Sequence, residues 1–236
     1  MRKTTWMAVA AAGLVLAASV AEAQTYRRYG GDNALRFRVG MLTPDGESEY
    51  WDDNALVFTG DADDFEDIVV GADFRFAIGG RLGVVISGDL WEGEEDQAYL
   101  DFVDAGNRDI FHTTTLDVGS LTAGLVFDLL PRDARIVPYV GAGGGFYFWT
   151  LTEEGDFIDF ADPEGPTIFF DLFEDEGEAL GWYGLVGLEV PVGAQWGLFA
   201  EGRWRNVEDE LSGDFAGFGD LDLSGREIYL GASWRF

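Results

Sequence analysis

The sequence contains no cysteine, one histidine and only 15 basic residues among its 236. Without cysteine, the fold contains no disulfide, and neither thiol chemistry nor a cysteine metal site is available. The 44 acidic residues give a formal charge of −29, which excludes nucleic acid as a partner because phosphates require Lys and Arg. The same imbalance argues against a peripheral protein held by anionic lipid.

Long apolar runs are also scarce, and the single clear one lies at the N-terminus. Arg2 and Lys3 precede the apolar stretch 6–20, and a small-residue A-x-A pattern follows, ending at Ala23. This arrangement predicts a signal peptide in residues 1–23, cleaved after Ala23, and therefore export. No second run of about 18 apolar residues follows, so we expect no transmembrane helix in the mature domain, residues 24–236.

The rest of the chain alternates between apolar and polar residues in eight stretches. Such alternation predicts strands, because successive side chains of a strand point to opposite faces. The expected strands are residues 34–43, 67–78, 82–91, 114–130, 136–151, 179–190, 196–207 and 221–236. Long connections follow the odd-numbered strands and short turns follow the second, fourth and sixth. This pattern is typical of an all-β, eight-stranded antiparallel up-and-down transmembrane β-barrel.

The acidic residues gather in the four long connections. Residues 44–67, 92–109, 152–178 and 206–220 hold 33 of the 44 acids and a single base, Arg108. The short turns should face the periplasm, so the four acidic loops should be extracellular. The net charge is thus predicted to belong to one end of the barrel.

The polar face of the strands carries both signs of charge in equal number. In a membrane barrel this face lines the lumen and the apolar face contacts lipid. A soluble, lipocalin-like barrel would reverse the faces, but a packed polar interior is the environment that requires charge balance. We expect the network to fill a narrow lumen, with a gate for small solutes as the alternative. The predicted lumen charges are Arg36, Arg38, Asp73, Arg75, Asp89, Asp128, Glu189, Glu201, Arg203, Arg205, Glu227 and Arg235.

Three stretches depart from simple alternation. Leu116 and Val118 fall on the polar parity of their strand, which predicts a bulge near Gly119. The glycines of 136–151 are expected to make room for large lumen neighbours or to permit strong coiling. The phenylalanines of 169–173 alternate with acids, as in the upper part of an extended hairpin or in an exposed contact patch.

Few residues carry the pattern of a chemical site. His112 has no serine or acid at a catalytic spacing, which favours a rim residue over a catalytic one, so no catalytic or cofactor-binding residue is predicted. Asp61, Asp63 and Asp64 provide oxygen ligands for loosely bound Ca²⁺ or Mg²⁺. The EF-hand spacing is absent, and a solvated, repulsive surface is the competing interpretation.

Two segments resemble known barrels. The strand from Ile136 to Phe146 resembles one found in small eight-stranded outer-membrane barrels of the OmpA, OmpX and OmpW type. The last strand is similar to the β-signal read by the barrel-assembly machinery, with Gly231 five residues before the terminal Phe236 and Trp234 two before it. Tyr229 stands where a polar residue is commoner.

This resemblance implies a location and partners. They are the outer membrane of a Gram-negative envelope, with its lipid and lipopolysaccharide as surroundings, the barrel-assembly machinery as insertion partner, and a monomeric state. The function expected first is a non-enzymatic structural or surface-interaction barrel that presents acidic loops. The alternatives are a transport channel for small solutes or apolar molecules, and a lipid A-modifying enzyme.

Overall fold

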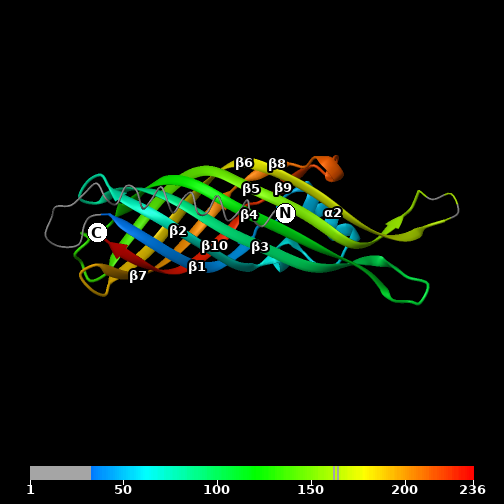
Figure 1. Cartoon of the computed structure of the whole chain (residues 1–236), viewed down its shortest axis with the longest axis horizontal. Helices are drawn as coiled ribbons and strands as arrows, with labels where there is room; N and C mark the ends of the chain where they lie inside the picture. The colour runs from blue at the N-terminus through cyan, green and yellow to red at the C-terminus, as the bar shows by residue number, and fades with distance from the viewer. Residues whose placement is uncertain (1–32, 162, 164) are drawn as a thin grey trace.

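Eight strands close into an antiparallel barrel in the computed structural model, which describes residues 33–161, 163 and 165–236 (Figure 1). The signal peptide expected in residues 1–23 lies outside the described residues. The ring follows the order β1-β10-β7-β6-β5-β4-β3-β2. The wall consists of β1 (Ala34–Pro44), β2 (Asp67–Ala77), β3 (Leu82–Val103), β4 (Asp109–Asp128), β5 (Val137–Asp159), β6 (Thr167–Pro191), β7 (Trp196–Asn206) and β10 (Gly225–Arg235).

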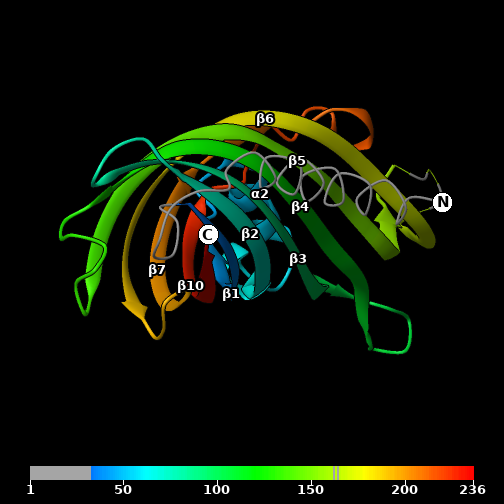
Figure 2. The same ribbon diagram turned by 60° about the vertical axis from the view of Figure 1, so that its left-hand side comes forward.

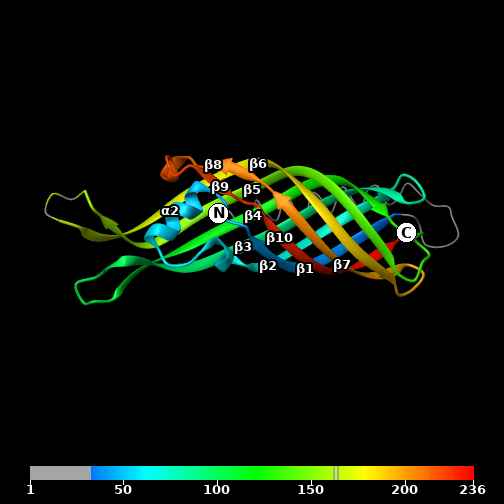
Figure 3. The same ribbon diagram turned by 180° about the vertical axis from the view of Figure 1, so that it is seen from behind.

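The ring is closed by β1, which pairs with β2 on one side and with β10 on the other. Short turns join β2 to β3, β4 to β5 and β6 to β7 at the end where the chain terminates (Figure 3). The long connections all lie at the opposite end. The fold class and the placement of long and short connections predicted from the sequence are confirmed.

Two hairpins, β3–β4 and β5–β6, are far taller than predicted. The strand expected to end at residue 91 continues to Val103, and the one expected to end at 151 continues to Asp159. Their partners start earlier than predicted, at Asp109 and Thr167. Acidic residues and threonines replace apolar ones on the lower outward rows of these extensions, which hid the strand pattern. Figure 2 shows both hairpins rising beyond the rest of the barrel.

The predicted bulge near Gly119 is wrong. The β4 register runs without interruption from His112 to Asp128 against β5, and its one irregularity against β3 lies between Ala98 and Val103. Leu116 and Val118 therefore keep the inward parity and are buried in the apolar core of the barrel. Both residues are apolar because they belong to an apolar layer inside the upper lumen. The sequence had predicted polar side chains along the whole lumen.

The first and last long connections fold into small elements of their own. The β1–β2 connection contains α2 (Glu49–Val57) and the 3₁₀ turn η1 (Ala62–Phe65). The β7–β10 connection contains β8 (Glu208–Glu210), the 3₁₀ turn η2 (Gly213–Phe215) and β9 (Asp220–Asp222). The predicted last strand, 221–236, is thus divided into β9 and β10. No helix in the part of the chain that the structure describes is long and apolar enough to cross a membrane.

The glycines of β5 provide space for a lumen tyrosine. A Cβ at Gly143 would lie 2.7 Å from the hydroxyl oxygen of Tyr183, and one at Gly124 would lie 2.6 Å from it. Gly187 accommodates Tyr139 in the same way, with a Cβ-to-ring distance of 2.2 Å. Large side chains therefore cross the lumen where their neighbours have none, as expected for a narrow, filled barrel.

Candidate functional site

The outer wall of the barrel is an apolar band. The outward positions carry exposed apolar residues on every wall strand, including Phe37, Ile86, Leu125 and Leu198. Phe74 shares the outward parity but is buried against Phe76 and Phe236, with the ring centroids of Phe74 and Phe236 5.6 Å apart. The inward positions carry the buried charged residues together with aromatic and some aliphatic side chains, so the candidate site of this protein is its lumen.

The lower lumen, near the short turns, holds two ion-pair groups. Asp128 accepts hydrogen bonds from Arg75 at 2.6 Å and from Arg132 at 2.7 Å. Glu189 accepts one from Arg235 at 2.7 Å. Arg132 belongs to a short turn and was missed as a lumen residue, because the alternation of a strand does not extend into a turn.

Two arginines of β1 lie in the middle of the lumen. Arg36 donates to Glu201 at 3.0 Å, and its guanidinium lies 3.7 Å from the ring centroid of Phe199. Arg38 donates to Asp89 from two nitrogens, at 2.9 and 2.7 Å, and also to Asp73. The two-point contact with Asp89 fixes the orientation of the guanidinium as well as its position.

Two arginines of β7, Arg203 and Arg205, complete the network in the middle lumen. Arg203 donates to Glu201 at 2.9 Å and to Asp89 at 3.5 Å. Arg205 donates to Glu227 at 3.4 Å and to the carbonyl oxygen of Leu223 at 2.7 Å. Asp89 and Glu201 are thus shared between arginines of different strands, so the network spans the lumen from wall to wall.

The structure brings all twelve predicted lumen charges into contact with partners of opposite sign. Eleven of them are buried, and the side chain of Arg235 at the lower end is 18% exposed. Buried charges are tolerated only when paired, because an isolated charge in a low-dielectric interior costs several kcal/mol. This arrangement can hold the wall strands in register, and it occupies the space that a solute would need.

The upper lumen is closed by an apolar plug that the sequence did not predict. Its loop side consists of Tyr50 and Trp51 from α2, Phe65 from η1 and Phe215 from η2. These rings lie in acidic loops, and large apolar side chains in such loops were the available signal. The wall residues that meet the plug are Leu42, Val69, Trp91, Leu116, Val118, Tyr147, Trp149, Leu151, Ala179, Val207 and Tyr229.

Polar contacts of Asp222 join the two loops of the plug to each other. The indole nitrogen of Trp51 donates to the carbonyl oxygen of Asp222 at 3.1 Å. The backbone N–H of Glu47 donates to the Asp222 carboxylate at 2.9 Å, and the N–H of Asp222 donates to the Ser48 hydroxyl at 3.2 Å. The plug is therefore one interlocked unit of the first and last loops.

Two titratable groups lie beneath α2, above the level of the apolar band. Tyr50 donates to Glu153 at 2.8 Å, and burial raises the pKa of Glu153 to about 7. His112 lies between Phe58 and Phe157, at ring-centroid distances of 4.4 and 5.1 Å. Burial lowers the pKa of His112 to about 4. Both groups are therefore neutral over the same part of the acidic pH range.

His112 is not positioned to act as the base of a nucleophile–base pair. Neither ring nitrogen has a hydrogen-bond partner among the described residues. Ser120, the nearest serine on the same strand, donates instead to Asp89 at 3.4 Å. The imidazole is enclosed by aromatic rings and has neither a hydroxyl to activate nor an acid to orient it.

The carboxylates of Asp61 and Asp64 serve the turn in which they lie. The side chain of Asp64 accepts the backbone N–H of Asp61 at 2.9 Å, and Asp61 reciprocates, so the pair forms a capping box around η1. Asp63 is the third residue of the predicted cation site. Within residues 33–161, 163 and 165–236, no group of three or more His, Asp or Glu side chains is arranged to hold a metal ion.

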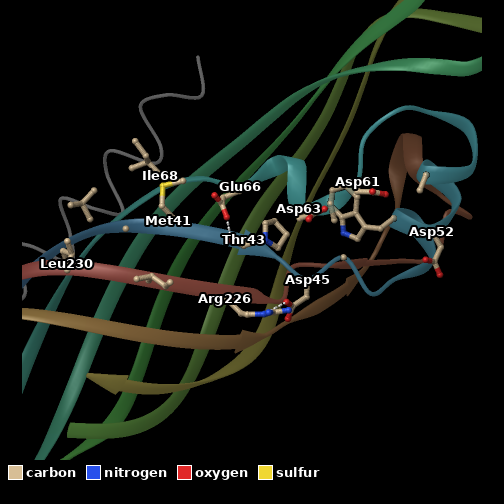
Figure 4. Close-up of a pocket in the computed structure, with 18 residues that line it drawn as sticks. Met41, Thr43, Asp45, Asp52, Asp61, Asp63, Glu66, Ile68, Arg226 and Leu230 are labelled. Atoms are coloured by element: carbon tan, nitrogen blue, oxygen red, sulfur yellow. Dashed lines mark hydrogen bonds and ion pairs between the residues drawn. The ribbon is translucent and has the colours of Figure 1, made fainter. Parts of the chain in front are cut away.

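A groove of about 1030 Å³ lies outside the lumen, where β1, β2 and β10 leave the apolar band (Figure 4). Met41, Ile68 and Leu230 form its apolar part, and acidic loop residues line the rest. Arg226, a base in its lining, donates to Asp45 at 3.1 Å. The groove is a surface of mixed polarity at the edge of the apolar band.

The predicted assembly-signal residues lie on both faces of β10. Tyr229 is fully buried in the lumen, where its hydroxyl donates to Glu227 at 3.0 Å. Trp234 points outward and lies 5.1 Å from the ring of Phe236. A Cβ at Gly231 would lie 2.3 Å from the ring of Phe199, so this glycine admits a lumen aromatic. The polar residue commonly found at position 229 is thus replaced by a tyrosine that joins the lumen network.

Comparison with known proteins identifies the fold. The structure resembles the crystal structure of Neisserial surface protein A with a TM-score of 0.50 and 11% identity, over 86% of this chain and 96% of that chain. Ail of Yersinia pestis (12% identity, TM-score 0.44, 89% and 100% coverage) and the E. coli outer membrane protein W (14%, 0.41, 89% and 100%) are also similar. No protein-family model and no curated protein matches the sequence. The chain has the fold of small eight-stranded outer-membrane barrels.

Proposed function

We propose that this protein is a plugged, non-enzymatic barrel of the outer membrane, with a structural or surface-interaction role. The proposal includes export by the signal peptide expected in residues 1–23 and insertion by the barrel-assembly machinery. The apolar outer wall supports a position in lipid, with outer-membrane lipid and lipopolysaccharide as its surroundings. The barrel would act as a monomer, because the ring is already closed on itself.

One observation favours a closed barrel over a channel, because two separate layers of side chains block the lumen. The arginine–carboxylate network fills the lower and middle parts, where Arg36, Arg38 and Arg203 are each buried between acids of different strands. The apolar plug fills the upper part. A solute would have to displace both layers. Displacing the arginine–carboxylate network would leave buried charges without partners, which is costly.

Conductance in a planar lipid bilayer tests this proposal. The purified, folded barrel should insert without producing discrete channel steps, with or without Ca²⁺. The matched control is a variant without the α2 part of the plug, in which residues 48–63 are replaced by a short Gly-Ser linker. It should also remain closed, because the charge network lies below the plug. Reproducible single-channel steps from the wild-type barrel would refute the closed-lumen proposal and favour a transport protein.

The acidic loops support a second element of the proposal, a cation-rich surface layer. The loops would attract Ca²⁺ or Mg²⁺ loosely, as a diffuse atmosphere around many carboxylates. The base nearest the β3–β4 tip, Arg108, donates to Asp104 at 2.8 and 2.5 Å and so leaves this end strongly negative. Charge screening by added salt should therefore weaken any binding of cationic partners to these loops.

A further inference from the structure

The outward face of the two tall hairpins continues above the apolar band as one four-stranded sheet. Its last apolar row is Leu90, Gly119 and Phe148, in direct register on β3, β4 and β5. The next outward row begins two residues higher, about 7 Å along each strand. Everything above that level belongs to the part of the hairpins outside the hydrocarbon, which Figure 1 shows as the two arms extending past α2.

Acidic residues dominate the first rows above the band. Outward side chains in the same row are neighbours across all four strands, with carboxylates on the two outer strands and Asp117 or a threonine on the two central ones. No Lys or Arg lies at these positions. The two rows are Glu92, Asp117, Thr150 and Glu176, followed by Glu94, Thr115, Thr152 and Glu174.

A second apolar surface, the tip patch, lies above these acidic rows. We define it as Phe102, Phe160, Ile168, Phe170 and Leu172. All five side chains are exposed, and that of Phe170 is 66% exposed. Phe102 and Phe160 join the two hairpins, with ring centroids 5.0 Å apart.

The tip patch is too far from the membrane to be covered by its own bilayer. Phe170 lies eight residues above Glu178 on β6, which is roughly 26 Å along the strand and, at a strand tilt of about 45°, roughly 18 Å along the membrane normal. Headgroups extend only about 5 to 7 Å beyond the hydrocarbon. Contiguous apolar surface in water marks an interaction site rather than ordinary surface.

Charge decides what kind of partner fits. A second copy of this chain would bring two sets of acidic rows together, and like charges in contact are repulsive. An anionic lipid surface would be repelled for the same reason. Asp156, which is outward and directly opposite Phe170, places a carboxylate within the patch itself. The complementary partner presents apolar and basic side chains on one face.

We propose that the tip patch and the acidic rows below it form a docking surface for a cationic amphipathic polypeptide segment. Apolar side chains of the partner cover Phe170, Ile168 and Leu172, and its Lys or Arg side chains reach the carboxylates. The proposal rests on the surface-interaction role proposed above and names the chemistry of the partner. Long-range attraction brings the segment to the acidic end, and apolar burial holds it there.

The test uses full mature barrel in phosphatidylcholine nanodiscs, which carry no net charge of their own. The probe is a labelled 18-residue helical peptide with leucines on one face and lysines on the other, and its binding is measured by fluorescence anisotropy. Empty nanodiscs give the background, and a peptide with glutamate in place of lysine is the charge control. We expect saturable binding of the lysine peptide alone, weakened by added salt.

Variants distinguish the contribution of the apolar tip patch to peptide binding from that of the acidic side chains. Phe170→Ser should weaken binding about tenfold or more, as for loss of a central apolar anchor. Its matched control is Phe218→Ser, a similarly exposed residue in the β7–β10 loop, which should bind as wild type. Glu154 and Asp156 lie directly opposite Leu172 and Phe170 of the patch. Glu154→Gln with Asp156→Asn should therefore weaken binding and reduce its salt dependence, whereas Glu208→Gln with Glu210→Gln, in β8, should change neither.

Three results would overturn the docking surface. They are no binding of the lysine peptide to heat-modifiable, folded barrel; equal binding by wild type and Phe170→Ser; or equal weakening by both pairs of charge variants. None of them bears on the closed lumen, which conductance tests separately. Failure of the docking proposal is therefore distinguishable from failure of the proposed function.

Discussion

Docking of α2 should respond to pH through two groups that it covers together. Tyr50 of α2 lies against Glu153, and Phe58, which caps the helix, lies against His112. If the segment from Tyr50 to Phe58 lifts from the barrel mouth, both groups regain water and their ordinary pKa values. The docked and undocked states therefore differ in the protonation of two sites, and pH shifts their balance.

Glu153 favours docking at low pH. Its pKa rises from the ordinary 4.5 to about 7 when α2 is docked, because burial penalises the carboxylate. A raised pKa gives stability that is fully present below pH 4.5 and lost as the pH rises through 7. The shift corresponds to about 3 kcal/mol of docking free energy across that window. The charged or titratable neighbours on the adjoining strands are His112, Glu95 and Asp175, and no Lys or Arg lies among them in the described chain.

His112 has the opposite effect over nearly the same window. Its pKa falls from 6.5 to about 4 on burial, since the imidazolium cannot be solvated between Phe58 and Phe157. A lowered pKa gives stability that is present above pH 6.5 and lost as the pH falls through 4. The magnitude is again about 3 kcal/mol. The two contributions cancel in large part, so docking in the wild type should vary little between pH 4.5 and 6.5.

Single substitutions should reveal the separate effects of Glu153 and His112 on the pH dependence of α2 docking. Glu153→Gln keeps an acceptor for Tyr50 and leaves the His112 effect alone, so docking should weaken as the pH falls from 6.5 to 4. His112→Phe suits its aromatic surroundings and leaves the Glu153 effect alone, so docking should strengthen as the pH falls from 7 to 4.5. Each slope should amount to a hundredfold change in the docking equilibrium, about 3 kcal/mol.

Fluorine NMR of 5-fluorotryptophan-labelled barrel measures this equilibrium. The Trp51 resonance is assigned by its loss in Trp51→Phe, and urea is added until docked and undocked signals are both visible. The double variant Glu153→Gln, His112→Phe is the control and should show no slope. Identical pH profiles for wild type and both single variants would refute the reasoning, because they would show that α2 does not cover these groups in common.

Two further predictions concern the network and assembly. Asp89→Ala should lower the free energy of unfolding by about 3 to 5 kcal/mol in urea titrations, because Arg38 and Arg203 would lose a shared buried partner; a loss below 1 kcal/mol would show that water already solvates these arginines. Phe236→Asp should reduce the heat-modifiable fraction recovered from outer membranes, since it places charge beside Phe74 and Trp234 on the lipid face; normal recovery would remove Phe236 from the assembly signal.

The sequence predicts the wall of this barrel well because strand alternation is a local property. Arg36 and Arg38 alternate with Leu35 and Phe37, and one pair of neighbours is enough to assign each residue to a face. The same rule places Asp89 and Glu201 inward. Alternation does not predict which charged side chains form ion pairs. The ion pair between Asp89 of β3 and Arg203 of β7 depends on closure of the ring, which no short stretch of sequence encodes.

The extension of β3 and the plug were missed for different reasons, whereas the extended hairpin predicted as one alternative at 169–173 is present in β6. The extension of β3 is a strand whose outward face is acidic, so its charge suggested a loop although alternation continued. The plug depends on contacts between the first and last loops, such as the bond from Trp51 to Asp222. Its residues could be noticed as aromatics in acidic surroundings, but their position over the lumen follows from tertiary contacts alone.

The two layers that close the lumen should differ in how they open. The arginine network is held by buried ion pairs, and separating Arg38 from Asp89 leaves a charge without a partner in a dry interior. The plug is held mainly by apolar contacts and by neutral hydrogen bonds such as that from Tyr50 to Glu153. Thermal or mechanical opening should therefore begin at α2 and stop at the network. The closed-lumen proposal therefore predicts a barrel whose outer loops can rearrange while the network below them stays in place.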